Sequence, residues 1–258
     1  MSNQHPTPPK MEMYPYYDEI PRPGRWWGRL AYKLMPLPLH VYFPLRDELY
    51  LQLIHLVAVF APWRFHRQTD LLVNVGAGLK GKPGWINVDM VKAPGINCLY
   101  DCRKRLPFPN ASVRGIFCEH FVEHLDYTEE VPYFLNECHR VLKPEGVLRI
   151  IVPDAEKYLC AYAAPGWEQL SALRPLDEGN VDAHYHCRYR TKMELINMVF
   201  RQGHRHKYAY DFETLHFILL RYGFSRVIRQ EFGRSWLPEL SIDSEEHATE
   251  SLYLDAIH

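Results

Sequence analysis

The chain has 258 residues, of which 47% are hydrophobic, and a formal net charge of −1 at pH 7. This length and composition suit one globular domain with appended segments. A near-neutral charge gives no overall attraction to nucleic acid, so we expect no nucleic-acid partner. The six cysteines lack paired spacing and there is no signal-peptide pattern, which favours reduced thiols and a cytoplasmic location.

The first 66 residues predict two segments outside the main domain. Residues 1–23 are rich in proline, which indicates an extended or disordered arm. Residues 24–66 mix aromatic and basic side chains and contain a predicted helix over 46–60. We expect this segment to pack on the main domain or to cap its substrate site, and peripheral contact with a membrane surface is the alternative. The apolar stretch from Leu49 to Trp63 is too short to span a membrane.

Residues 71–78, Leu-Leu-Val-Asn-Val-Gly-Ala-Gly, predict a buried strand that ends in a tight glycine turn. Glycines in such a turn let the backbone approach a ligand closely. Residues 85–89, Trp-Ile-Asn-Val-Asp, predict a second strand that ends on an acid, where a carboxylate can accept hydrogen bonds from ribose hydroxyls. The two strands together indicate a cofactor that contains a nucleoside.

The interval between Gly78 and Asp89 selects among such cofactors. A nicotinamide-binding unit has Gly-x-Gly-x-x-Gly, a full helix, and an acid about 20 residues further on. Here the interval is too short for a crossover helix, so residues 79–84 form a loop or at most one turn. A diphosphate is held at a helix N-terminus, which this loop does not provide. A cofactor without phosphates, S-adenosylmethionine (SAM), fits the spacing better.

The remaining pattern alternates strands and helices. Strands are expected at 71–75, 85–88, 96–99, 113–118, 147–152, 226–229 and 250–257, and helices at 129–142 and 211–222. This order predicts an α/β, Rossmann-like, doubly wound and mostly parallel sheet of about seven strands, with ligands at the carboxyl ends of the strands. We assign residues 67–258 to this domain and residues 163–208 to a substrate loop that follows the fifth strand.

Five motifs follow one another along the chain: Asn74-Val-Gly-Ala-Gly78, Val88-Asp89, Asp101 with Leu106-Pro-Phe-Pro109, Phe117 to Leu125, and Glu137 to Gly146 before Ile151-Val-Pro-Asp154. With these motifs, the chain from residue 70 to 257 resembles a class I SAM-dependent methyltransferase of the "methyltransferase type 11" group. The helix-Leu-Lys-Pro-x-Gly-strand segment is the most specific part of the resemblance. Two positions depart from the family pattern, because Asn74 replaces the usual acid and Lys80 replaces a small residue.

The resemblance implies methyl transfer as the activity and a SAM site at the ends of the first four strands. Gly76 and Gly78 would line the methionine part of SAM, and Asp89 would hold the ribose. Asp101 would meet the adenine amino group. The implied cofactor-binding residues are Asn74, Gly76, Gly78, Asp89, Met90, Asp101, Cys102, Cys118 and Glu119.

Three histidines are candidate catalytic bases. His120 follows the fourth strand directly, at the edge of the expected cleft. His204 and His206 lie in the basic stretch of the substrate loop, whose arginines would meet a carboxylate, a phosphate or sugar hydroxyls. The residues expected to bind this acceptor are Asp154, Arg188, Arg205 and Tyr208.

A metal-binding interpretation competes at the fourth strand. His120-Phe-Val-Glu-His124 matches the H-x-x-E-H pattern of inverted zinc proteases. The motif begins at the end of a buried strand of a cofactor fold, and the sequence offers no third-ligand motif. We therefore expect no metal, and we expect His124 to be a structural, hydrogen-bonded histidine.

The sequence predicts a SAM-dependent methyltransferase that acts on a small molecule or glycan, with an oxygen as the expected acceptor atom. A sulfonium is already a good electrophile, so the enzyme has to align the acceptor and supply a base. Methylation of nitrogen or carbon by the same fold is one alternative, and a non-catalytic SAM-binding regulatory protein is another. No motif specifies the acceptor or the oligomeric state.

Overall fold

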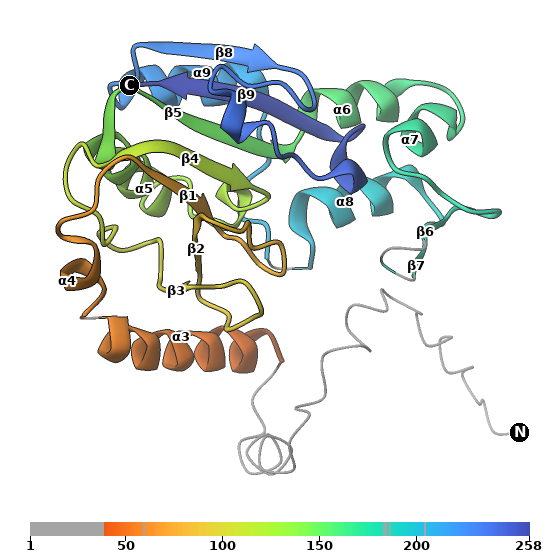
Figure 1. Cartoon of the computed structure of the whole chain (residues 1–258). Coiled ribbons are helices and arrows are strands. Elements are labelled where there is room, and N and C mark those ends of the chain that lie inside the picture. The colour runs from red at the N-terminus through yellow and green to blue at the C-terminus, as the bar shows by residue number, and fades with distance from the viewer. Residues whose placement is uncertain (1–38, 59, 183–184, 186, 204) are drawn as a thin grey trace, which may run out of the picture.

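The computed structural model describes residues 39–58, 60–182, 185, 187–203 and 205–258. The predicted arm at 1–23, the start of the N-terminal segment at 24–38, and His204 lie outside these residues. A seven-stranded sheet forms the centre of the molecule, in the order β3-β2-β1-β4-β5-β9-β8 (Figure 1). Its strands are β1 (Leu71–Val75), β2 (Ile86–Asp89), β3 (Cys98–Leu99), β4 (Val113–Glu119), β5 (Leu142–Pro153), β8 (Arg226–Gln230) and β9 (Ser251–Ile257).

Most neighbouring strands in this sheet are parallel. The pairs from β3 through β5 all run in the same direction. β9 is antiparallel to both β5 and β8, between which it lies. Every residue of β9 is buried, which suits a strand covered on both faces. The expected α/β fold with a mostly parallel sheet of seven strands is confirmed.

The connection between β1 and β2 contains turns and no helix. The Lys80 amide donates to the Ala77 carbonyl at 2.8 Å, which closes a single tight turn after β1. The expected loop between Gly78 and Asp89 is therefore confirmed, and the first crossover is too short to carry the helix of a diphosphate-binding unit.

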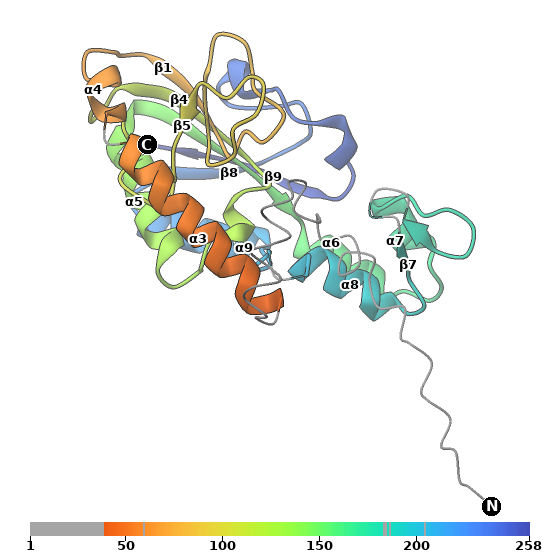
Figure 2. The same ribbon diagram turned by 90° about the horizontal axis from the view of Figure 1, so that it is seen from below.

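Helices α5 (Glu130–Val141) and α9 (Phe212–Arg221) cover one face of the sheet (Figures 1 and 2). The buried stripe of α5 contributes Val131, Phe134, Leu135, Cys138 and Val141 to the main core, as its spacing predicts. The opposite face is covered differently. There the segment between β8 and β9 packs Leu237 and Leu240, around the 3₁₀ turn η2 (Pro238–Leu240), against Phe117.

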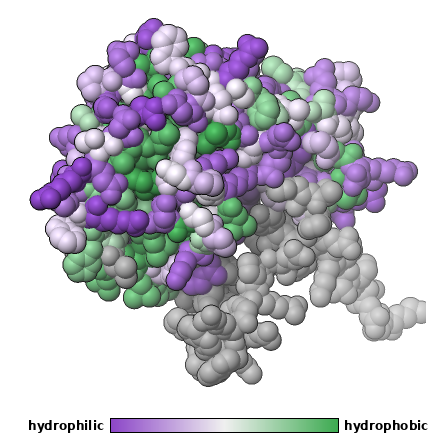
Figure 3. Space-filling view, viewed as in Figure 1, coloured by the Kyte–Doolittle hydropathy of each residue, from purple (hydrophilic) through white to green (hydrophobic). Residues whose placement is uncertain are grey.

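Helix α3 (Leu39–Ala58) begins earlier than the predicted helix and lies along the β3 edge of the sheet (Figure 1). It buries Leu51, Ile54 and Ala58 against Met90, Leu99 and Tyr100. A short helix, α4 (Ala61–Phe65), follows. The outward side of this region exposes apolar side chains, which Figure 3 shows gathered over α3. These include Leu49, Leu53, Leu56, Phe60 and Trp63. Among the described residues, no helix is long and apolar enough to cross a membrane.

Residues 163–208, expected to be a substrate loop, contain much regular structure. After α6 (Ala155–Ala163) come α7 (Glu168–Leu173), the short strands β6 (Val181–Asp182) and β7 (Cys187–Arg188), and α8 (Lys192–Arg201). Their apolar side chains share a separate core that includes Tyr158, Leu170, Tyr189 and Leu195. This helical subdomain packs beyond the carboxyl end of β5 (Figure 1). That it receives the substrate stays a prediction.

Candidate active site

The glycine turn after β1 is shaped for close approach of a ligand. Gly76 has φ +67° and Gly78 has φ +51°, in the left-handed region that favours glycine. A Cβ on Gly76 would lie 2.7 Å from the ring of Phe121, which excludes any larger residue there. A Cβ on Gly78 would meet nothing within 4 Å, so its backbone faces open space. The two glycines are therefore required for different reasons, one for packing and one for access.

Asp89 ends β2 beside this turn. Its carboxylate accepts hydrogen bonds from the amides of Gly78 at 2.8 Å and Val91 at 2.7 Å. The side chain is only half-buried, so the acceptor sites that these two amides leave can meet ribose hydroxyls. The structure thus brings together the glycine turn and the acid that the sequence places in one site.

Asn74 has its side chain turned into the protein. Its amide nitrogen donates to the Lys80 carbonyl and to Oδ1 of Asn87, each at 3.2 Å. Both of these partners are acceptors, so an amide fits the position where a carboxylate would be repelled. This explains why an asparagine replaces the usual acid, because the Asn74 side chain holds the turn together through these two hydrogen bonds. Both are donated by its amide nitrogen, which leaves that nitrogen without a donor for the predicted contact with the cofactor.

Asp101 is buried after β3, and its carboxylate is already paired with Arg103 and His55. Oδ2 lies 3.1 Å from Nε2 of His55, on α3, and 3.0 Å from a guanidinium nitrogen of Arg103. Burial acts to raise the pKa of Asp101, but the hydrogen bonds from Arg103 and His55 lower it below its ordinary value. The carboxylate that would meet the adenine amino group therefore has its charge compensated from within the protein.

Met90 and Cys102 belong to the same end of the expected site. Met90 packs against the buried side of α3, and the Cys102 thiol is buried in the main core. Burial raises the pKa of this thiol well above its ordinary value. Helix α3 thus lies over the expected adenine end of the site. The contacts of Met90, Asp101 and Cys102 with adenine stay a prediction.

The residues at the end of β4 point in three directions. The Cys118 thiol lies in the main core, and burial raises its pKa, so only the backbone of this residue is available to a cofactor. Glu119 accepts hydrogen bonds from the amide of Ser244 at 2.8 Å and from its hydroxyl at 2.5 Å. The backbone of His120 has φ +50°, a left-handed conformation that turns its ring toward the β9 side of the sheet.

The imidazole of His120 is the centre of a polar network. Nδ1 lies 3.1 Å from Oε1 of the buried Glu123, and Nε2 lies 3.1 Å from the Ser251 hydroxyl. The ring also packs on the ring of His247, with 4.1 Å between their centroids. Burial acts to lower the pKa of His120, but Glu123, together with Glu250 and Glu119, raises it above its ordinary value.

A second histidine–carboxylate pair faces the first. Nδ1 of His247 lies 2.8 Å from Oε1 of Glu250, which is buried and also accepts from Arg174 at 2.8 Å and from the hydroxyl of Tyr158. Sequence reasoning missed this pair. A signal was present, because His247-Ala-Thr-Glu250 repeats the H-x-x-E spacing of His120-Phe-Val-Glu123.

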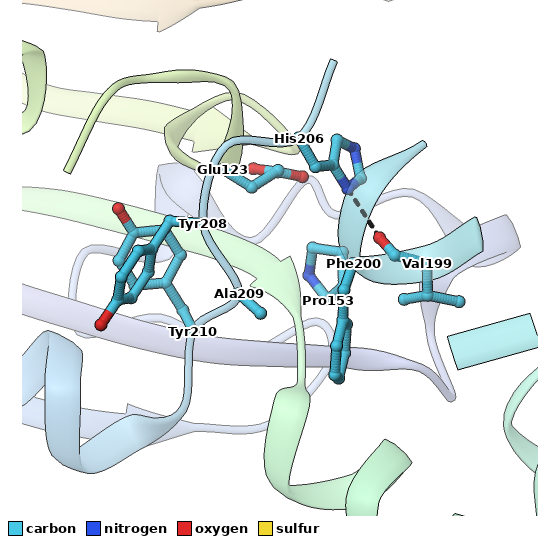
Figure 4. Close-up of a pocket in the computed structure, with 8 residues that line it drawn as sticks. All are labelled: Glu123, Pro153, Val199, Phe200, His206, Tyr208, Ala209 and Tyr210. Atoms are coloured by element: carbon cyan, nitrogen blue, oxygen red, sulfur yellow. Dashed lines mark hydrogen bonds between the residues drawn. The ribbon is translucent and has the colours of Figure 1, made fainter. Parts of the chain in front are cut away.

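His206 lies beside Glu123 (Figure 4) and also close to His124. Nδ1 of His206 is 2.7 Å from the Val199 carbonyl, and the His206 and His124 rings meet edge to face at 4.7 Å. Burial lowers the pKa of His206 to about 4. His206 therefore belongs to a different group of side chains from the His120–His247 pair, and a role for it as the catalytic base stays a prediction.

The four predicted acceptor-binding residues are dispersed. Asp154 is fully buried, caps α6 through the Glu156 and Lys157 amides, and has no accessible group for an acceptor. Tyr208 stacks on Tyr127 with 4.1 Å between ring centroids. The exposed Arg188 donates to the Gly179 carbonyl at 2.9 Å. Arg205 is exposed, and its carbonyl lies 3.1 Å from Nδ1 of His124.

One family model matches part of the chain. Residues 88–150, from the end of β2 through most of β5, match the family model described as "Methyltransferase domain". No curated protein matches the chain.

The solved structures that are similar to it include the following three. A SAM-dependent methyltransferase from Archaeoglobus fulgidus is 21% identical over 84% of this chain and 100% of that one, with a TM-score of 0.45. The 1,6-didemethyltoxoflavin-N1-methyltransferase of Burkholderia thailandensis is 14% identical over 86% and 92%, with a TM-score of 0.44. A SAM-dependent methyltransferase from Mesorhizobium loti is 18% identical over 74% and 92%, with a TM-score of 0.42.

The strand order is that of a Rossmann-like fold, and the glycine turn is held against Asp89 at the carboxyl edge of the sheet. Residues 88–150 of this fold are similar to the methyltransferase domain family.

Proposed function

We propose that this methyltransferase transfers the methyl group of SAM to a hydroxyl oxygen of a small molecule or glycan, and that His120 takes the proton of that hydroxyl. The observation that carries the proposal is the His120–Glu123 pair at the end of β4, with 3.1 Å between Nδ1 and Oε1. Phe121, the next residue, packs directly on Gly76 of the glycine turn. The candidate base is therefore adjacent to the expected methionine end of the cofactor site.

The residues present fit SAM at its ribose and methionine parts. The open space beside Gly78 leaves room for a ligand against the backbone, and the half-buried Asp89 supplies acceptors for hydroxyls. When bound, SAM supplies an electrophilic methyl group. The contribution of the protein is then to align the acceptor and to remove its proton.

The pairing of His120 supports a hydroxyl as the acceptor group. With its proton on Nδ1, facing Glu123, the ring has its lone pair on Nε2, which lies 3.1 Å from the Ser251 hydroxyl and is the nitrogen that would take a proton. The Glu123 carboxylate then stabilises the imidazolium that forms. A hydroxyl has to lose its proton during methyl transfer, so it needs such a base. An amine that is already neutral can be methylated without one, which makes nitrogen the weaker candidate.

The charges around His120 favour a neutral acceptor. Glu119, Glu123 and Glu250 all act on the His120 ring, and Arg174 is engaged by Glu250 and Asp182. This balance of charge disfavours an anion next to the base and suits a sugar or phenol hydroxyl. The arginines that suggested an anionic acceptor lie elsewhere on the subdomain.

The test is a screen of sugars, phenols and carboxylic acids for formation of S-adenosylhomocysteine, followed by the variant His120→Asn. We expect this variant to lose roughly 100- to 10,000-fold in turnover, the range for removal of a general base, with SAM affinity by calorimetry unchanged. His216→Ala, on α9, removes a histidine outside the network and should keep full turnover. Unchanged turnover in His120→Asn, or a product methylated on nitrogen or carbon, would refute the proposal.

A further inference from the structure

The carboxylate of Glu123 is buried without a full set of partners. Only 2% of the side chain is exposed, and among the described residues only His120 pairs with it, with Nδ1 3.1 Å from Oε1. No described residue donates a hydrogen bond to Oε2 or forms an ion pair with it. Burial of a carboxylate in this state is costly unless a further positive or donating group meets it. The orphaned oxygen therefore points to a ligand.

Two imidazoles stand beside this carboxylate, and both are oriented by backbone carbonyls. Nδ1 of His124 lies 3.1 Å from the Arg205 carbonyl, and Nδ1 of His206 lies 2.7 Å from the Val199 carbonyl. A carbonyl can only accept, so each Nδ1 carries the proton and each Nε2 is left with a lone pair. Metal-binding histidines commonly have this arrangement, in which the nitrogen that is not a ligand donates to a carbonyl.

We propose that Glu123, His124 and His206 bind one divalent transition-metal ion, with Zn²⁺ as the natural occupant. One ligand atom from each residue lies within 4.8 Å of the others. Two imidazoles and a carboxylate form a ligand set that zinc accepts with a fourth position open to water. The nitrogen donors favour zinc over Mg²⁺ or Ca²⁺, which prefer oxygen ligands only.

The surrounding backbone holds the three ligands in place. Glu123 and His124 lie in the 3₁₀ turn η1 (Val122–His124), and the Glu123 carbonyl accepts from the Lys207 amide at 2.7 Å. The turn and the segment that carries His206 are thus joined before any ion binds. Zinc–nitrogen bonds of about 2.0–2.1 Å put tetrahedral ligand atoms about 3.4 Å apart. The ligand atoms lie within 4.8 Å of one another, so side-chain rotation has to bring the most distant pair closer by no more than about 1.5 Å.

The H-x-x-E-H motif contributes Glu123 and His124 to this site, and not the two histidines that bind the metal in inverted zinc proteases. His120 and His124 would share a face of an α-helix, but η1 is a single 3₁₀ turn, and His120 instead faces Ser251 and His247. The third ligand, His206, comes from the segment after α8. The sequence alone predicted no metal because this ligand is distant along the chain.

The test uses the full, tag-free chain after dialysis against a chelator, titrated with Co²⁺ and followed by visible absorption and calorimetry. We expect one ion per chain, tetrahedral Co²⁺ bands and displacement by Zn²⁺. The double variant His124→Ala/His206→Ala should bind at least about a hundredfold more weakly, because loss of an outer-shell partner alone costs 10- to 100-fold. The matched variant His139→Ala/His216→Ala removes the same number of histidines outside the site and should keep the affinity.

Glu123→Gln provides a second variant that keeps the side-chain shape, and it should also lose Co²⁺ affinity. Melting curves and SAM titrations without metal show whether each variant is folded. Equal Co²⁺ affinity in the parent and the His124/His206 variant, or no binding by a folded parent, would overturn the proposal. Co²⁺ binding is measured by spectroscopy and calorimetry and not by turnover, so the result of this test does not depend on the proposed methyl transfer.

Discussion

Asp89 shows how one side chain can organise a binding site before the ligand arrives. Its carboxylate holds the Gly78 amide and so fixes the distance between the ends of β1 and β2. Asp101, by contrast, is engaged by Arg103 and His55. Asp89 and Asp101 look equivalent in the sequence, but in the folded chain one accepts hydrogen bonds from backbone amides and the other is paired with Arg103 and His55.

Asp89→Ala should weaken SAM binding by about 1.5–3 kcal/mol, the range for hydrogen bonds to a charged group, which is roughly 10- to 150-fold in Kd. Asp101→Asn should weaken it less, because the Asp101 charge is already neutralised by the protein. Calorimetric titration of SAM into each variant measures both. A larger loss in Asp101→Asn than in Asp89→Ala would contradict this assignment.

The parts of the site found from the sequence are those carried by local motifs. Gly76, Gly78 and Asp89 each follow directly from a strand that ends in a turn. The partners of Glu250 and Asp101 were not found, because Arg174, Tyr158 and His55 come from distant segments. Contacts between residues far apart in the chain produce no spacing pattern in the sequence.

Among the elements, α3 has two opposite apolar sides. Leu51, Ile54 and Ala58 pack against the residues that follow β2 and β3, while Leu53 is 61% exposed and Leu56 is 72% exposed. Exposed apolar side chains of this kind are not covered by any other described part of the chain. Only the inner side contributes to the stability of the fold described here.

Ile54→Ala should lower the free energy of unfolding by about 2–4 kcal/mol, as for buried aliphatic residues. Leu53→Ala, at the preceding position, should change it by no more than about 0.5 kcal/mol. Chemical denaturation of the two variants beside the parent makes the comparison. Equal losses in both would show that the outer side is buried too.

The elements with a strong local pattern were the ones predicted from the sequence. β1, β4 and β5 are apolar runs, and α5 and α9 have clear apolar stripes. The subdomain from α7 to α8 was expected as a loop, because its short helices share a core with α6 that no single stretch reveals. The cover of the second sheet face by Leu237 and Leu240 was missed for the same reason.

For the whole molecule, Glu250 joins the helical subdomain to the sheet. It precedes β9 and binds Tyr158 of α6 and Arg174, which follows α7. Burial acts to raise its pKa, but His247, Arg174 and Tyr158 lower it from 4.5 to about 2. The ionised form is therefore the one that stabilises the fold.

A carboxylate with a lowered pKa contributes its full stabilisation above the unfolded pKa, and loses it as the pH falls through the folded pKa. For Glu250 this window runs from about 4.5 down to about 2, and the contribution is about 3 kcal/mol. Glu250→Gln should be less stable than the parent at pH 7 and should approach it near pH 2. Urea unfolding across this pH range tests the expectation, with Glu231→Gln, an exposed acid, as the control. A constant difference at every pH would contradict it.

The position of β9 has a consequence for the nascent chain. β8 is synthesised before β9 but has no other neighbour in the sheet, and β5 meets only β9 on its outer side. Until residues 251–257 emerge, β5, a long and largely buried strand, remains an open edge. Unpaired apolar edges are the sites at which chains aggregate, and pairing over such a sequence distance is slow. A chain arrested or cleaved before residue 251 should therefore present β5 to chaperones, or to another copy of itself.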